Sequence, residues 1–273
     1  MIRSKGLGVL LRVSTALALV FVYVPLGLVL VNSFNTDRTF AWPPSGFTLH
    51  WWKLAAQSKG ARDALLVSIE VALLATAIAL VLGTLAGLAL RRTRFFGRNT
   101  VSLLIILPIA LPGIVTGIAL NNAFRTMLGI DLGFLTIVVA HATFCIVTVF
   151  NNVQARLQRL GSSLEQASAD LGAGPFLTFR RVTFPMMRSA LLAGALLAFG
   201  LSFDEIVVTK YLAGTVLTLP LWIYGNIQRP FNRPIVNVVA LVVLLVSIIP
   251  IYIAQRLTGS AQGIAVTEEA GPG

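Results

Sequence analysis

The sequence predicts an all-α membrane protein with six transmembrane helices. Of the 273 residues, 56% are hydrophobic and 11% are charged, and the mean hydropathy is +0.86. Soluble domains carry about 25% charged residues. A bilayer core about 30 Å thick needs about 20 mostly apolar helical residues. Six runs meet this requirement, at residues 10–31, 65–90, 101–120, 132–153, 189–208 and 235–255.

These runs indicate a single transmembrane domain over residues 1–256. The first run follows Arg3, Lys5 and Arg12, as the apolar part of a signal peptide would. Its apolar stretch is longer than that of a signal peptide, so we interpret it as a retained first helix. Residues 257–273 are small and polar, and we expect a disordered tail.

The distribution of basic residues predicts the orientation of the chain. The short segment RRTRFFGRN holds Arg91, Arg92, Arg94 and Arg98 and no acid. Short basic loops stay on the cytoplasmic side. We therefore expect both termini, and the polar segment 165–185, in the cytoplasm. The formal net charge of +11 fits this role, and it does not indicate nucleic-acid binding, because no basic face with interleaved aromatic residues occurs.

The sequence predicts no catalytic site and no metal site in this chain. The single cysteine, Cys145, excludes an internal disulfide and lies in an apolar run, where it is expected to pack. His141 has no neighbouring Cys, Asp or Glu, so we expect it to pack or to form hydrogen bonds rather than to bind metal. No G-x-x-x-x-G-K-[ST] motif is present, so no ATP is expected on this chain.

The segment EQASADLGAGPFLTFRRVTFP, residues 165–185, interrupts the apolar pattern between the fourth and fifth runs. Good helix formers open it, and GAGP then breaks the helix, because Gly permits positive φ and Pro starts a new segment. A second short helix is expected to expose apolar side chains. Two interpretations have equal weight: a docking surface for another protein, or an amphipathic helix lying on the inner leaflet.

The spacing of Gly172, Val182, Phe184 and Pro185 resembles the EAA loop of permease subunits in ABC importers. In that family the loop carries a coupling helix that docks on a cytoplasmic ATPase. The family triplet Glu-Ala-Ala aligns with Gln166, Ala167 and Ser168, and Glu165 stands one position early. The resemblance implies these coupling residues: Glu165, Gln166, Ala167, Ser168, Asp170, Leu171, Gly172, Phe176 and Pro185.

Three further segments resemble the spermidine/putrescine-type branch of these permeases. They are HATFC (141–145), LSFDEIVVTKYLAG (201–214) and TLPLWIYGNI (218–227). The resemblance implies half of the path for a polyamine or related small solute in a prokaryotic inner membrane. It also implies several partners, namely a second homologous permease subunit, two copies of an ATPase that binds ATP and Mg, and an extracytoplasmic substrate-binding protein.

Two other functions stay open from the residues alone. An ion-coupled secondary transporter would use the intramembrane acids as ion sites, and such folds usually carry paired inverted repeats. No internal repeat is visible in this sequence. A non-transporting membrane scaffold would need no docking segment matched to an ATPase.

Pro108 and Pro112 lie inside the third predicted span. Each proline removes a backbone hydrogen bond and kinks a helix. The bend either lines or moves the substrate path, or is a static kink accommodated by packing.

Acidic residues inside predicted spans are functional candidates because burying a charge in a bilayer is costly. Asp204 and Glu205 lie near the end of the fifth span, where Ser202, Glu205 and Thr209 would form one polar stripe. Asp204 and Glu205 either face the path and attract a cationic substrate, or brace helix ends or pair with Lys210 or with an arginine of the partner subunit. Glu70, in the second span, either lines the same path or pairs with a basic residue.

Overall fold

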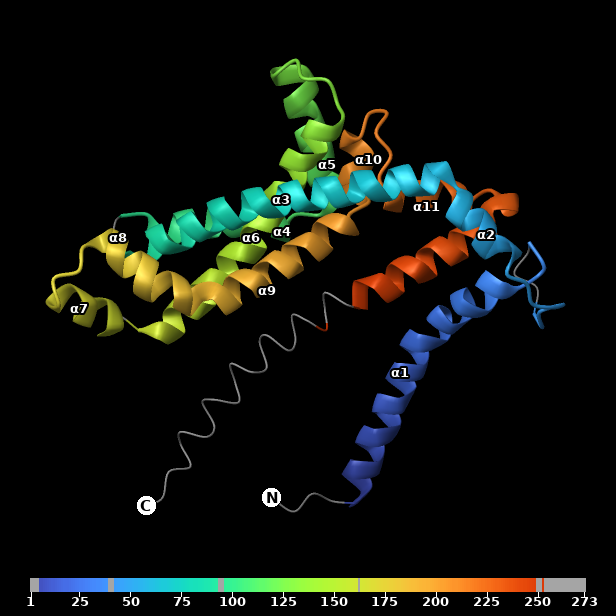
Figure 1. The fold of residues 1–273 in the computed structure, drawn as a ribbon, viewed down its shortest axis with the longest axis horizontal. Helices are drawn as coiled ribbons and strands as arrows, with labels where there is room; N and C mark the ends of the chain where they lie inside the picture. Colours follow the sequence, from blue (N-terminus) through green and yellow to red (C-terminus); the bar gives the residue numbers. More distant parts are fainter. Residues whose placement is uncertain (1–4, 39–41, 93–95, 162, 249–251, 253–273) are drawn as a thin grey trace. The chain divides into compact units, whose positions relative to one another are not determined.

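The computed structural model describes residues 5–38, 42–92, 96–161, 163–248 and 252 (Figure 1). In this part of the chain the structure is helical, and its β pairing is one isolated bridge between Asn35 and Phe47. The α-helices are α1 (Lys5–Phe34), α2 (His50–Gln57), α3 (Lys59–Arg92), α4 (Arg98–Ala110), α5 (Gly113–Asn122), α6 (Phe134–Leu160), α7 (Ser163–Asp170), α8 (Pro175–Thr178), α9 (Phe184–Phe203), α10 (Val207–Leu212) and α11 (Leu219–Ile227). Short π-helical turns η1 (Ala123–Met127) and η2 (Phe179–Thr183) follow α5 and α8, and a 3-10 turn η3 (Pro230–Asn232) opens the last helical segment.

The all-α, six-span prediction is confirmed, with one span broken. Five described helices are long and apolar enough to cross a membrane, and a bent helix pair makes up to six. The five are Gly8–Phe34, Lys59–Arg91, Phe134–Leu160, Pro175–Phe203 and Pro230–Ile248. The predicted tail 257–273, and residues 249–251 and 253–255 of the sixth run, lie outside the described residues.

The third span is a bent pair rather than one kinked helix. Helix α4 and the α5–η1 segment meet at an angle of 103°. Pro112 lies at the bend, and Leu111 before it has extended ψ of 142°, as expected of a residue that precedes proline. Pro108 lies within α4 and does not end it. The break therefore arises at the second of the two prolines.

The fifth span begins and ends earlier than the sequence indicates. It runs continuously from Pro175 to Phe203, through α8, η2 and α9. The expected second short helix is therefore the first part of this span. The wider η2 turn comes just before Pro185, which lacks the N–H that a regular α-helix needs there. At the far end the helix stops at Phe203, five residues before the predicted boundary, and α10 follows after a break.

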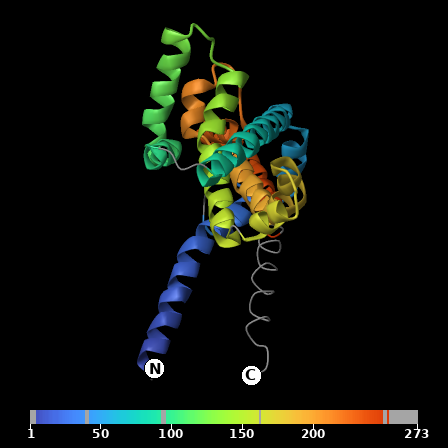
Figure 2. The ribbon, with the colours of Figure 1, turned by 90° about the vertical axis from the view of Figure 1, so that its left-hand side faces the viewer.

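The described chain divides into two compact units, residues 64–221 with 247–273, and residues 1–63 with 222–246. In the larger unit α3, α6 and α9 lie side by side, and α10 lies beside α5 (Figures 1 and 2). Glycines allow the close approach of α3 to α6. A Cβ atom at Gly83 would lie 2.9 Å from the carbonyl oxygen of Ile146, and one at Gly87 would lie 2.6 Å from Val153 Cγ1.

Two buried clusters form the core of the larger unit. One joins α3, α6 and α10 through residues such as Val71, Ile137 and Leu212. The other joins α3, α6 and α9 and includes Cys145 and Met187. Helix α6 runs through both clusters, so it is the central helix of this unit. It also carries buried polar side chains, including that of His141.

The smaller unit contains α1, α2 and the last helical segment. The indole nitrogen of Trp51 donates to the carbonyl oxygen of Asn35 at 2.7 Å. The guanidinium of Arg38 lies over the rings of Trp51 and Phe231, at 5.7 and 5.4 Å from their centres. Helix α1 is exposed along most of its length and carries little of the packing in this unit.

Candidate functional site

A helix, a tight turn and a second helix form the segment 165–185, as the sequence predicts. Helix α7 ends in paired backbone bonds, from Gly172 N–H to Ala169 C=O at 2.8 Å and from Ala173 N–H to Ser168 C=O at 3.0 Å. Gly172 has φ of +79°, the left-handed conformation that this C-terminal motif requires and that side chains disfavour. Position 172 therefore favours glycine because of its left-handed backbone conformation.

The turn presents apolar side chains outward. Leu171 is 88% exposed and Phe176 is 76% exposed. Gln166, Ala167 and Asp170 are also exposed. Ser168 is half-buried, and its hydroxyl lies 3.0 Å from that of Thr178, which ties α7 to α8. The exposed tip of the turn is thus held by bonds made behind it.

Glu165 points back into its own chain. Its Oε1 accepts a hydrogen bond from the Thr183 hydroxyl at 2.8 Å. The same oxygen lies 3.9 Å from the Arg91 guanidinium at the end of α3. Arg91 also donates to the carbonyl oxygen of Gly161. In the sequence Arg91 indicates only the orientation of the chain, and nothing singles out Thr183. The reason is that 74 positions separate Arg91 from Glu165 and no short-range pattern links them.

The two acids after α9 lie in a break between helices. Asp204 ends α9 and is exposed, with its N–H bonded to the Gly200 carbonyl at 3.2 Å. The carboxylate of Glu205 accepts the backbone N–H of Val208 at 2.9 Å, at the start of α10. Glu205 therefore braces a helix end, one of the two roles left open by the sequence.

The expected polar stripe of Ser202, Glu205 and Thr209 is interrupted, because the helix breaks between residues 203 and 207. Ser202 and Thr209 instead converge on His141 of α6. The Ser202 hydroxyl lies 2.8 Å from Nδ1, and the Thr209 hydroxyl lies 2.9 Å from Nε2. All three residues are at most 3% exposed. The hydrogen-bonding role predicted for His141 is confirmed.

The bonds of Thr209 fix the tautomer of this histidine. The Thr209 hydroxyl donates its one hydrogen to the Glu205 carbonyl at 2.7 Å, so it accepts from His141 Nε2–H. In the neutral ring, Nδ1 is then the acceptor for the Ser202 hydroxyl. One imidazole thus joins α6 to both sides of the α9–α10 break.

The carbonyl groups at the end of α10 are also bonded to neighbouring helices. Asn121 Nδ2 donates to the Tyr211 carbonyl at 2.5 Å, and the Thr136 hydroxyl donates to the Leu212 carbonyl at 2.9 Å. A Cβ atom at Gly117 would lie 2.8 Å from the Tyr211 ring. Helix α10 is therefore fixed to α5 and α6 at its C-terminal end.

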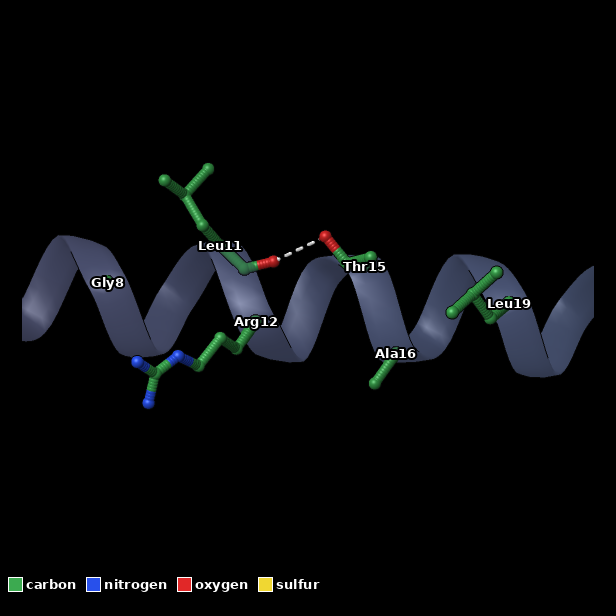
Figure 3. Close-up of a pocket in the computed structure, with 6 residues that line it drawn as sticks. All are labelled: Gly8, Leu11, Arg12, Thr15, Ala16 and Leu19. Atoms are coloured by element: carbon green, nitrogen blue, oxygen red, sulfur yellow. Dashed lines mark hydrogen bonds between the residues drawn. The ribbon is translucent and has the colours of Figure 1, made fainter. Parts of the chain in front are cut away.

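Other candidate positions show no comparable arrangement. Glu70 is exposed on α3, and no ion pair to it occurs within the described residues. In the same part of the chain no cluster of His, Cys, Asp and Glu could hold a metal ion. Figure 3 shows a hollow along α1, lined by Gly8, Leu11, Arg12, Thr15, Ala16 and Leu19. All the residues that line this hollow come from one helix, so it is not an enclosed site. The Thr15 hydroxyl in it is already bonded to the Leu11 carbonyl at 2.8 Å.

Comparison with known proteins assigns the chain to a family. Residues 79–260 match the family described as binding-protein-dependent transport system inner membrane component. This is most of the chain. The protein belongs to this family. It is therefore an inner-membrane component of a binding-protein-dependent transport system, of the kind called an ABC permease.

Similar permeases indicate which branch of the family the chain resembles. The chain is 34% identical over 238 residues to the spermidine/putrescine transport system permease protein PotC of Escherichia coli K12, covering 87% of this chain and 89% of the relative. It is 33% identical over 236 residues to the putrescine transport system permease protein PotI of the same strain, covering 84% and 83%. It is also 31% identical to a putative 2-aminoethylphosphonate permease, PhnV, of Salmonella typhi, covering 86% and 89%.

Solved structures confirm the permease fold. A bacterial ABC transporter involved in the import of the acidic polysaccharide alginate matches with a TM-score of 0.69, covering 95% of this chain and 98% of that chain at 17% identity. The MetNI methionine ABC transporter in inward-facing conformations matches with a TM-score of 0.60, covering 78% and 99% at 16% identity. At these identities the likeness concerns the fold.

Proposed function

We propose that this permease forms half of the path for a polyamine or a related small solute and takes its energy from a separate ATPase. The curated relatives named for spermidine and putrescine cover more than four fifths of the chain, which supports the substrate class. The expected partners are a second homologous permease subunit, two copies of the ATPase, which bind ATP and Mg, and an extracytoplasmic substrate-binding protein.

The exposed turn between α7 and α8 is the proposed docking site for the ATPase, and it is the observation that carries the coupling role. Leu171 and Phe176 expose apolar surface beside the polar Gln166 and Asp170. Exposed large apolar side chains that cluster on one turn mark an interaction surface. Docking on a cytoplasmic ATPase requires that the segment 165–185 lies in the cytoplasm. The basic segment after α3 predicts this location, and it predicts the same side for both termini.

Asp204 is the proposed contact for the cationic solute. It is exposed at the α9–α10 break, whereas the carboxylate of Glu205 already binds the α10 backbone. Ser202 and Thr209 are buried against His141 and are proposed to shape the break rather than to touch the solute. Glu70, exposed on α3, is proposed to face the other permease subunit or the path.

The coupling role is tested by replacing the apolar tip of the turn. The permease is co-expressed with its transport partners, purified in detergent and reconstituted in liposomes with the binding protein. We expect Phe176→Asp to reduce both ATPase co-purification and ATP-driven uptake of radiolabelled spermidine at least about tenfold, as for an interface anchor.

Phe96→Asp is the matched control, because Phe96 is a fully exposed phenylalanine in the neighbouring connection after α3. We expect it to leave assembly and uptake unchanged. Normal assembly and uptake with Phe176→Asp would contradict the docking assignment. ATP-driven uptake of other solutes, with spermidine and putrescine excluded, would contradict the substrate class.

A further inference from the structure

The end of α3 is fastened to the connection between α6 and α9 at two points. The Arg91 guanidinium lies 3.9 Å from the Glu165 carboxylate in α7 and donates to the carbonyl oxygen of Gly161 just before α7. The side chains of Arg91 and Glu165 are only 17% and 23% exposed. An isolated surface ion pair contributes little, but here one rigid guanidinium combines the ion pair with a hydrogen bond to a backbone carbonyl, which restricts its geometry.

Glu165 joins a third segment to this contact. Thr183, which is 2% exposed, donates its hydroxyl to the same carboxylate oxygen at 2.8 Å. The surrounding space is nearly filled, with a residual cavity of about 10 Å³. A cavity of this size is at the lower limit for one water molecule, so little solvent separates these side chains.

We propose that Arg91 and Glu165 form an internal latch that makes the 165–185 segment and α3 move as one body. Glu165 is then a positioning residue for coupling, and it does not supply the acidic contact to the ATPase. This inference rests on the proposed coupling role of the segment. It explains why the acid stands one position before Gln166, on the side of α7 that faces Arg91 and Thr183.

Helix α3 is suited to carry this motion across the unit. The Ser68 hydroxyl accepts the backbone N–H of Leu219 at 2.8 Å, at the start of α11. Ser68 and Arg91 are 23 positions apart, which is about 35 Å at a rise of about 1.5 Å per residue. Between them, Gly83 and Gly87 hold α3 directly against α6. A displacement at Arg91 is therefore passed along a tightly packed helix to the start of α11.

The latch is tested by a double-mutant cycle in the assembled, reconstituted complex. Arg91→Ala, Glu165→Ala and the double variant are compared by spermidine uptake per ATP hydrolysed, with ATPase co-purification measured in parallel. We expect each single change to lower uptake per ATP about fivefold or more, the lower end of typical coupling between sites. The double variant should show the same uptake per ATP as each single variant, because either change alone already breaks the contact between Arg91 and Glu165.

Arg98→Ala is the matched control, because Arg98 lies on the same basic segment, is exposed, and has no ion pair among the described residues. It should leave uptake per ATP unchanged. Arg91→Lys keeps the charge but loses the fork geometry, and Glu165→Gln keeps an acceptor for Thr183; both should give intermediate values. ATPase co-purification should stay normal in all of them, which a folding defect would not allow.

Three results would overturn the latch. The first is an Arg91→Ala effect no larger than that of Arg98→Ala, and the second is single effects that multiply in the double variant. Loss of ATPase co-purification with Glu165→Gln would also overturn it, since the carboxylate would then be a docking contact. Failure of the proposed function looks different, because the unmodified complex would itself show no ATP-driven uptake.

Discussion

The Nδ1 atom of His141 lies 2.8 Å from the Ser202 hydroxyl, while Nε2 lies 2.9 Å from the hydroxyl of Thr209. One imidazole thus bonds to residues on both sides of the break between α9 and α10. A buried side chain with both ring nitrogens bonded fixes the geometry of its neighbours, because each lost bond would leave a polar group without a partner.

Replacing His141 should loosen the break. His141→Leu leaves the Ser202 and Thr209 hydroxyls without the imidazole, which should lower the free energy of unfolding by about 1–3 kcal/mol, since bonds between membrane helices contribute about 0.6–2 kcal/mol each. The measurement is the thermal stability of the detergent-solubilised complex. His50→Leu, at the exposed other histidine, should change it little. Equal stability of the two variants would contradict the network.

Close packing of α3 on α6 should make Gly83 intolerant of a side chain. A Cβ atom there would lie 2.9 Å from the Ile146 carbonyl and 3.1 Å from the Phe150 nitrogen, and these backbone atoms cannot rotate away. We expect Gly83→Ala to destabilise the protein by about 1–3 kcal/mol. Gly200→Ala in α9 has open space around it and should be neutral or stabilising by up to about 1 kcal/mol. The same thermal assay ranks the two, and the reverse order would refute the packing argument.

The positive φ of Gly172 predicts an order of substitutions at the turn. There is no atom within 4 Å of a Cβ placed there, so the cost is conformational. Gly172→Ala should lower the local stability of the turn by about 1–2 kcal/mol. Gly172→Asn should lower it less, because Asn tolerates the left-handed region. Gly174→Ala is the control, since Gly174 has φ of −67° and open space. Protease sensitivity of the turn and spermidine uptake should both follow the order Gly174→Ala, Gly172→Asn, Gly172→Ala. If Gly172→Asn lowered uptake and raised protease sensitivity more than Gly172→Ala, side-chain size and not backbone conformation would determine the cost.

Asp204 and Glu205 should behave differently despite being neighbours. Asp204→Asn removes an exposed charge and should raise the KM for spermidine uptake about two- to fivefold, since a partly solvated ion pair contributes about 0.5–1 kcal/mol. Glu205→Gln keeps an oxygen that accepts the Val208 N–H and should leave KM unchanged. Glu205→Ala removes that cap and should lower thermal stability by about 0.5–2 kcal/mol. A KM effect of Glu205→Gln equal to that of Asp204→Asn would place both acids on the path.

Local patterns account for the elements that the sequence predicts correctly. Long apolar runs of sufficient length define the spans, and the GAGP turn with Gly172 and Pro175 defines the interruption between α7 and α8. These predictions hold because chain length, hydropathy and the φ preferences of Gly and Pro act within a few residues. The same locality explains the wrong end of the fifth span, since the apolar residues 206–208 directly follow the two acids and extend the apparent run.

Only the tertiary structure decides which residues meet. Arg91 and Glu165 are far apart in sequence, as are His141 and Thr209, and their contacts exist because the end of α3 lies beside α7 and α10 packs against α6. Sequence alone determined that this chain crosses a membrane and carries a polar turn of defined shape. The fold decided that Glu165 faces its own chain, that Glu205 caps α10, and that Ser202 and Thr209 bind a histidine. Side-chain direction depends on where a helix bends and what packs against it, and neither can be read from spacing along the chain.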